Sequence, residues 1–184
     1  MTPVRQTIFV ADHPKGRGNC MSAALASILD LPLAEVIDLA SDEVREGPRG
    51  FFASIDDWLG DRGLKFVSWW DHPNDDELDR SAMREALAGR YSIGSGPSPR
   101  GPFHHAIICK SGRMVWDPHP SDDGVTRIEH HQLIEPMTDA EKALHDRRRW
   151  LREEDLQKWR SDRCPHGVRS ECTACEPLAR LNHR

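Results

Sequence analysis

A cysteine at the start of an apolar helix is the first candidate for chemistry in this sequence. Cys20 follows a Gly-rich turn at 16–19 and opens a run of small and apolar residues over 21–29. The unpaired amides and the dipole at a helix N-terminus stabilise a thiolate there and lower the thiol pKa. A cysteine nucleophile is usually held on a rigid element of this kind. A small core residue at a helix start is the ordinary alternative.

A cysteine nucleophile needs a base within hydrogen-bond reach and a group that orients the base. Of the ten histidines, His105 is singled out because it begins an apolar strand over 105–109. Strand alternation places His105 on the same face as Cys109, interpreted here as a core residue, and His104 on the other face.

A carboxylate is expected beside this histidine. The Ser111-Gly112 turn predicts a hairpin whose second strand ends before Asp117. Because a hairpin brings the start of its first strand toward the end of its second, we expect Asp117 to lie close to His105. A surface histidine and a turn aspartate before proline would give the same sequence pattern.

Four potential metal ligands are crowded near the C-terminus, namely Cys164, His166, Cys172 and Cys175. Zinc favours four sulfur and nitrogen ligands in a tetrahedron, and a C-x2-C turn supplies two of them. A tail this short has no core of its own, so the metal would provide its folding energy. We predict a structural Zn²⁺ here, with free thiols or a disulfide as the alternatives.

The spacing of apolar residues predicts the elements that must position these groups. Helices are expected at 19–30, 31–36, 51–60 and 77–88, separated by turns rich in Gly, Pro and Asp. Strands are expected at 6–10, 64–70, 91–94, 103–109, 113–116 and 125–129.

The composition changes near residues 136–140. Thr138 begins a capping-box pattern, and the chain is then heavily charged to about residue 162 with a narrow apolar stripe. We therefore expect a catalytic-type domain over 1–136, a charged helical extension over 137–162 and a zinc-knuckle tail over 163–184.

The whole chain excludes several classes of protein. Its 184 residues suit one domain with an appendage, and its net charge of −5 argues against a nucleic-acid partner. We expect no signal peptide and no membrane partner, because no apolar run is long enough to span a bilayer. The uneven spread of five cysteines is not that of a secreted disulfide framework, so a cytoplasmic location is expected.

Three short motifs together resemble a known fold. Gly18-Asn19-Cys20 heads a small-residue helix, His105-Ala106-Ile107-Ile108 follows, and Trp116-Asp117-Pro118 comes next. In this order they resemble the papain-like cysteine peptidases, most closely the C39-like group, and small phage-encoded and bacterial proteins of this type. The resemblance covers about residues 5–130. It implies an α+β fold with a Cys-headed helix on a small antiparallel sheet, in a bacterial or phage-infected cell.

The resemblance also assigns roles. It makes Cys20 the nucleophile, His105 the general base and then acid, and Asp117 the orienting group, with His119 as a rival for that third role. The family expects a glutamine oxyanion donor before the nucleophile, and Gln6 is the only upstream glutamine, separated from Cys20 by an apparent insertion at 11–18. The Cys20 backbone amide would be the second donor.

The implied reaction is acyl transfer through a thioester on Cys20. The expected substrate is a peptide, isopeptide or other amide, including one within a protein, and Trp69-Trp70 and the loop 94–102 are candidates to line its groove. A transferase would use the same chemistry with another acceptor. A different reading is an inactive papain-like adaptor that acts through its C-terminal helix and zinc knuckle.

Overall fold

An antiparallel sheet of five strands organises the first part of the chain. The computed structural model describes residues 1–47, 49–71 and 75–149. The strands are β1 (Leu64–Trp70), β2 (Tyr91–Pro97), β3 (His104–Lys110), β4 (Arg113–Trp116) and β5 (His130–Pro136). Their order in the sheet is β1-β5-β2-β3-β4, and each neighbouring pair is antiparallel.

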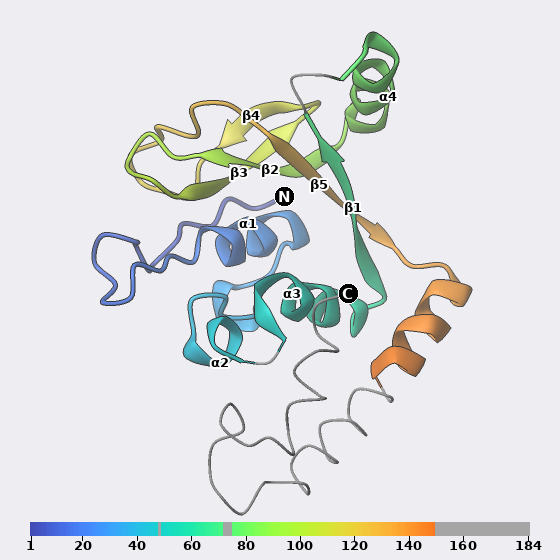
Figure 1. The fold of residues 1–184 in the computed structure, drawn as a ribbon, viewed down its shortest axis with the longest axis horizontal. Coiled ribbons are helices and arrows are strands. Elements are labelled where there is room, and N and C mark those ends of the chain that lie inside the picture. Colours follow the sequence, from blue (N-terminus) through green and yellow to red (C-terminus); the bar gives the residue numbers. More distant parts are fainter. Residues whose placement is uncertain (48, 72–74, 150–184) are drawn as a thin grey trace, which may run out of the picture. The chain divides into compact units, whose positions relative to one another are not determined.

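The helices connect and cover this sheet. They are α1 (Cys20–Leu29), the 3₁₀ turn η1 (Leu33–Glu35), α2 (Asp42–Arg45), α3 (Gly50–Gly60) and α4 (Glu77–Leu87). The first of them packs against β3 and β2, while α3 packs against β1 and α2. Figure 1 shows α1 between the sheet and the pair formed by α2 and α3.

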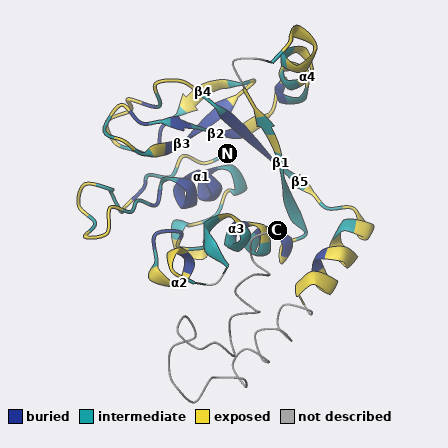
Figure 2. Ribbon diagram, viewed as in Figure 1, coloured by how far each residue is buried: buried dark blue, intermediate teal, exposed yellow. Residues whose placement is uncertain are grey.

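Small side chains explain the close approach of α1 to the sheet. Ala23, Ala24 and Ala26 are buried together with Leu25, and Figure 2 shows this helix in the colour of buried residues over most of its length. Asp30 ends the helix in the left-handed conformation, with φ 54°. The start of α1, where Cys20 lies, is therefore held rigidly against the sheet.

The core lies mainly between α1, α3 and one face of the sheet. Leu25, Ile55 and Leu59 from the helices meet Ile93 and Ile108 from β2 and β3. Burying side chains of this kind contributes about 1.5–3 kcal/mol each to folding.

The opposite face of the sheet is also closely packed. Gly94 pairs with Ile107, and a Cβ at Gly94 would lie 2.6 Å from Cys109 Sγ. Cys109 is fully buried, as predicted for a core residue, and burial raises its pKa to about 12.

Most of the expected elements are confirmed, and two strands are wrong. Residues 6–10 form no strand, because the backbone amides of Thr7 and Ile8 bond to the Asn19 side chain instead of a neighbouring strand. The strand expected at 125–129 begins only at His130.

Smaller differences concern the region after α1. The helix expected at 31–36 is a 3₁₀ turn, and the polar stretch after Ser41 contains the short helix α2, which the Ser41 hydroxyl caps. The mixed α+β class expected from the sequence is confirmed.

The chain divides into two compact units, Met1–Thr138 and Asp139–Arg184. In the second unit, residues 139–149 are helical. The zinc-knuckle tail expected over 163–184 lies outside the described residues. Within the part of the chain that is described, no helix is long and apolar enough to cross a membrane.

Candidate functional site

The hairpin of β3 and β4 brings a histidine and an aspartate into direct contact. His105 is the second residue of β3, and Asp117 follows directly after β4. Nε2 of His105 lies 2.6 Å from Oδ1 of Asp117, and the two residues are only 3% and 1% exposed. The distance is short because one or both partners carry charge.

Asp117 is fixed by further hydrogen bonds to both carboxylate oxygens. The backbone N–H of His119 donates to Oδ1 at 2.8 Å, and that of Gly124 donates to Oδ2 at 2.8 Å. Arg100 Nη1 also reaches Oδ2, at 3.4 Å. Burial acts to raise the pKa of Asp117, but the hydrogen bond with His105 and these backbone donors outweigh it and hold the pKa at about 2. The carboxylate is therefore ionised at neutral pH.

The second partner of His105 is Cys20. Burial acts to lower the pKa of His105, but its hydrogen bonds with Asp117 and with Cys20 raise it to about 9. Because Nε2 is directed at Asp117, the other ring nitrogen, Nδ1, is the one available to the thiol. The three candidate catalytic residues thus form one connected cluster.

Cys20 occupies the first position of α1 and is partly exposed. Burial opposes ionisation of its thiol, but the hydrogen bond and charge of His105 and the backbone amides of Ala106 and Met21 favour it, so that its pKa is lowered. A lowered cysteine pKa beside a raised histidine pKa describes a thiolate and an imidazolium that stabilise each other.

Asn19 has a role that sequence reasoning missed. It precedes α1, yet its side chain does not cap the helix. Instead, Oδ1 accepts the backbone N–H groups of Thr7 and Ile8, both at 3.0 Å, and Nδ2 donates to the Thr7 hydroxyl at 3.1 Å. The buried Asn19 thereby ties the N-terminal segment to the start of α1.

Gln6 lies in this same N-terminal segment. Its side-chain Nε2 donates to the carbonyl of Ile8 at 3.2 Å, and that carbonyl also accepts the backbone N–H of Asn19 at 3.2 Å. Residues 9–18 therefore form a loop that leaves at Ile8 and returns beside it at Asn19. Gln6 is buried, and its Oε1 has no partner among the described residues.

The segment after Asp117 is anchored by Arg5. Its Nη1 donates to the carbonyls of Asp117 and His119 at 2.9 and 2.7 Å, and its guanidinium lies 3.9 Å from the centre of the Trp116 ring. The imidazole of His119 bonds to the Ser121 hydroxyl at 2.8 Å. Of the two candidates for the orienting role, Asp117 is therefore the one that bonds to His105, whereas the ring centre of His119 lies 6.3 Å from that of His105.

The two groove candidates lie in the sheet and the loop that follows it. Trp70 is 55% exposed and stacks on His130 with ring centres 3.9 Å apart. The loop 94–102 begins within β2, and its Arg100 reaches the Asp117 carboxylate.

The predicted zinc ligands Cys164, His166, Cys172 and Cys175 lie outside the described residues. Within the part of the chain that the structure does describe, no group of three or more His, Cys, Asp or Glu side chains could hold a metal ion.

Arg5 and Arg100 were missed for the same reason as Asn19. Each makes contacts across a long stretch of chain, and only the tertiary structure shows the carbonyls and carboxylates that they reach. The one signal in the sequence was the place of Asn19 directly before Cys20. Comparison of the chain with family models, curated proteins and solved structures finds no match.

Proposed function

We propose that this protein is a cysteine-dependent hydrolase of papain-like type, which cleaves a peptide, isopeptide or other amide. The observation that carries the proposal is the placement of His105, with Nε2 on the Asp117 carboxylate at 2.6 Å and its other nitrogen available to Cys20. A buried, oriented imidazole beside a cysteine with a lowered pKa is the arrangement that nucleophilic catalysis requires.

The first half of the proposed reaction forms a thioester. The Cys20 thiolate attacks the substrate carbonyl carbon, and the electron pair of the C=O bond moves to the oxygen. The Cys20 backbone N–H and the Gln6 side-chain Nε2–H are the proposed donors to this oxyanion. The intermediate then collapses, the C–N bond breaks, and the His105 imidazolium gives its proton to the leaving amine.

The second half releases the acyl group. Neutral His105 takes a proton from water, whose oxygen attacks the thioester carbonyl. Collapse of this second intermediate breaks the C–S bond, yields a carboxylic acid and restores the thiolate–imidazolium pair. Asp117 stays ionised throughout and holds the imidazole in its orientation, since its pKa of about 2 lies far below neutral pH.

An activated ester tests the proposal without knowledge of the natural substrate. With 4-nitrophenyl acetate, we expect a burst of nitrophenolate and an acetyl group on the Cys20 peptide detected by mass spectrometry. The burst should vanish in Cys20→Ala and in His105→Ala. The matched control is His104→Ala, because His104 is the neighbouring, exposed histidine of β3 and its side chain bonds to Glu129 and, among the described residues, to no member of the Cys20 cluster.

Two results would contradict the proposal. One is the absence of an acetylated Cys20 peptide in the wild-type protein. The other is equal acetylation in wild type and His105→Ala, which would show that the imidazole does not activate the thiol. Either result would favour the adaptor function, in which the cluster has no catalytic role.

A further inference from the structure

Arg45, the last residue of α2, bonds to the rest of the described structure through only one of its three guanidinium nitrogens. Its Nε donates to the carbonyl of Leu39 at 2.7 Å, and the guanidinium lies over the Phe51 ring at 4.3 Å from the ring centre. Among the described residues, its two Nη groups have no hydrogen-bond acceptor and no carboxylate partner. The side chain is thus held in position, while its two Nη groups stay available to donate hydrogen bonds to a ligand.

A chain of hydrogen bonds links Arg45 to the first turn of α1, the helix that begins at Cys20. Leu39, which accepts from Arg45, donates its own N–H to the Ser22 hydroxyl at 3.2 Å. Ser22 lies in the first turn of α1, two residues after Cys20. Burial and the neighbouring Arg17 lower the pKa of Arg45, and the charge of Cys20 acts in the opposite direction.

The neighbouring Arg17 shows by contrast what is unusual about Arg45. Arg17 is also close to the start of α1, but it forms ion pairs with Asp42 at 2.5 Å and with Glu46 at 2.6 Å. Its charge is therefore satisfied within the protein. Arg45, between these two carboxylates in sequence, has no such pair in the described structure.

We propose that Arg45 binds a carboxylate of the substrate beside Cys20. This inference rests on the proposed hydrolase function and narrows the substrate to an amide or peptide that carries an acidic group near the bond to be cleaved. A guanidinium with two free Nη groups matches the two oxygens of a carboxylate. Stacking on Phe51 fixes the plane of the fork before the substrate arrives, which lowers the entropy lost on binding.

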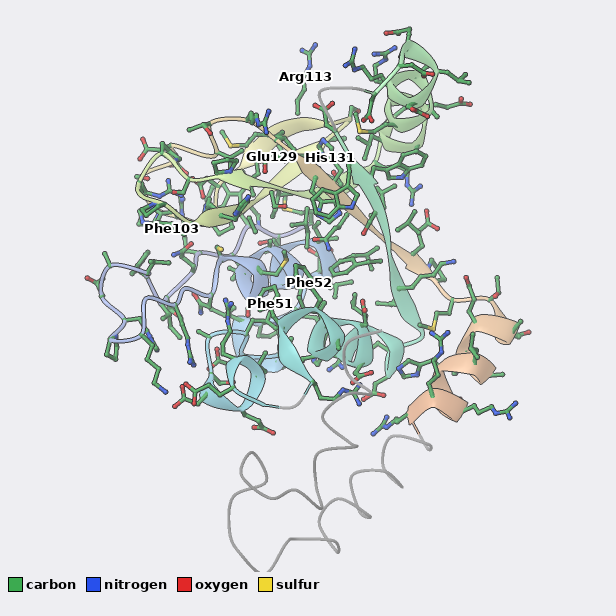
Figure 3. All side chains as sticks on the ribbon, viewed as in Figure 1. Phe51, Phe52, Phe103, Arg113, Glu129 and His131 are labelled. Carbon is green, nitrogen blue, oxygen red and sulfur yellow. The ribbon has the colours of Figure 1, made fainter. Side chains whose placement is uncertain are left out.

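The surroundings of Arg45 give the site an apolar side. Phe52 is 63% exposed, and its ring meets that of Phe51 edge-on with centres 5.2 Å apart. Figure 3 labels both rings at the start of α3. We therefore expect the acidic group of the substrate to be accompanied by apolar atoms that contact Phe52.

Two small alkylating reagents test the site directly. Iodoacetate transfers a carboxymethyl group to sulfur and iodoacetamide a carbamoylmethyl group, in each case with formation of the S–C bond, cleavage of the C–I bond and release of iodide. They differ in that only iodoacetate carries a carboxylate. The measured quantity is the ratio of their rate constants for Cys20, obtained by peptide mass spectrometry of the full chain.

We expect this ratio to fall by roughly threefold to fivefold in Arg45→Gln, the effect of one partly exposed charge pair. The rate with iodoacetamide should be unchanged, which also shows that the variant is folded. Arg45→Lys should recover part of the ratio. Arg62→Gln is the matched control, because Arg62 likewise stacks on an aromatic ring, at 3.8 Å from Trp58, and donates to a backbone carbonyl.

An unchanged ratio in Arg45→Gln, or an equal fall in Arg62→Gln, would overturn the assignment of Arg45 while leaving the hydrolase proposal in place. If Cys20 reacts with neither reagent faster than a free thiol, the result contradicts the proposed hydrolase function. It then also contradicts the carboxylate site at Arg45, which rests on that function. These outcomes separate the two proposals.

Discussion

Asn19 holds Ile8 at both of its backbone groups. The N–H of Ile8 donates to Asn19 Oδ1 at 3.0 Å, and its carbonyl accepts the N–H of Asn19 at 3.2 Å. The same carbonyl accepts Gln6 Nε2. The pair of Asn19 and Ile8 thus joins the start of α1 to Gln6, the proposed oxyanion donor.

Replacement of Asn19 by Ala should destabilise the protein. The change removes three hydrogen bonds and leaves the N–H groups of Thr7 and Ile8 without an acceptor. We expect the free energy of unfolding in urea to fall by about 2–4 kcal/mol. Ser41→Ala, which removes the partly buried side-chain cap of α2, should cost about 1 kcal/mol. Equal losses in the two variants would show that the Asn19 network is not a structural anchor.

Replacement of Gln6 by Ala should separate two reactions of the same cysteine. Acylation by 4-nitrophenyl acetate develops an oxyanion, so its rate should fall by about 10- to 1,000-fold. Alkylation by iodoacetamide develops none, so its rate should be unchanged. Parallel losses in both rates would mean that Gln6 maintains the structure, and no loss in either would remove it from the oxyanion site.

The charge of Asp117 should set the alkaline limit of activity. Deprotonation of His105 above its pKa of about 9 ends the thiolate–imidazolium pair and removes the proton that the leaving group needs. In Asp117→Asn the imidazolium loses its counter-charge, so we expect the alkaline limb of the acylation rate to move down by about one pH unit or more. Asp123→Asn is the control, since Asp123 is exposed and pairs with Arg100, at 3.7 Å, without bonding to His105 in the described structure. A limb that stays in place would contradict the role given to Asp117.

The C-terminal tail should bind zinc. We predict about one Zn²⁺ per chain by elemental analysis of the purified protein, held by Cys164, His166, Cys172 and Cys175. Cys172→Ser should reduce the zinc content strongly, whereas Cys20→Ser should leave it unchanged. Zinc retained by Cys172→Ser, or lost from Cys20→Ser, would place the metal elsewhere.

The placement of Cys20, His105 and Asp117 could be predicted because each depends on residues that are close together in the sequence. Small residues over 21–29 fix α1, and the Ser111-Gly112 turn fixes the β3–β4 hairpin that joins His105 to Asp117. Neighbouring strands and a helix start are encoded in short stretches of sequence, so the positions of these groups followed from spacing.

The rest of the site depends on contacts between distant residues. The interior strand β5, which lies between β1 and β2, was missed because it begins with three polar residues that are nevertheless buried, His130, His131 and Gln132. The bond of Asn19 to Ile8 and the placement of Arg45 on the Leu39 carbonyl and the Phe51 ring are likewise set by the tertiary structure. Polar residues inside a fold carry no periodic signal, so their partners appear only in the structure.

The pH dependence of Cys20 alkylation by iodoacetamide tests the central claim most directly. In the wild-type protein, the thiolate should persist well below the ordinary thiol pKa of about 8.5, and the reaction should slow only as the pH falls through the lowered pKa of Cys20. In His105→Ala, the burial that opposes ionisation remains while the stabilising charge is lost, so reactivity should shift to alkaline pH. His104→Ala should behave as wild type. A wild-type Cys20 that titrates like a free thiol, or that is unaffected by His105→Ala, would contradict the thiolate–imidazolium pair and with it the proposed hydrolase.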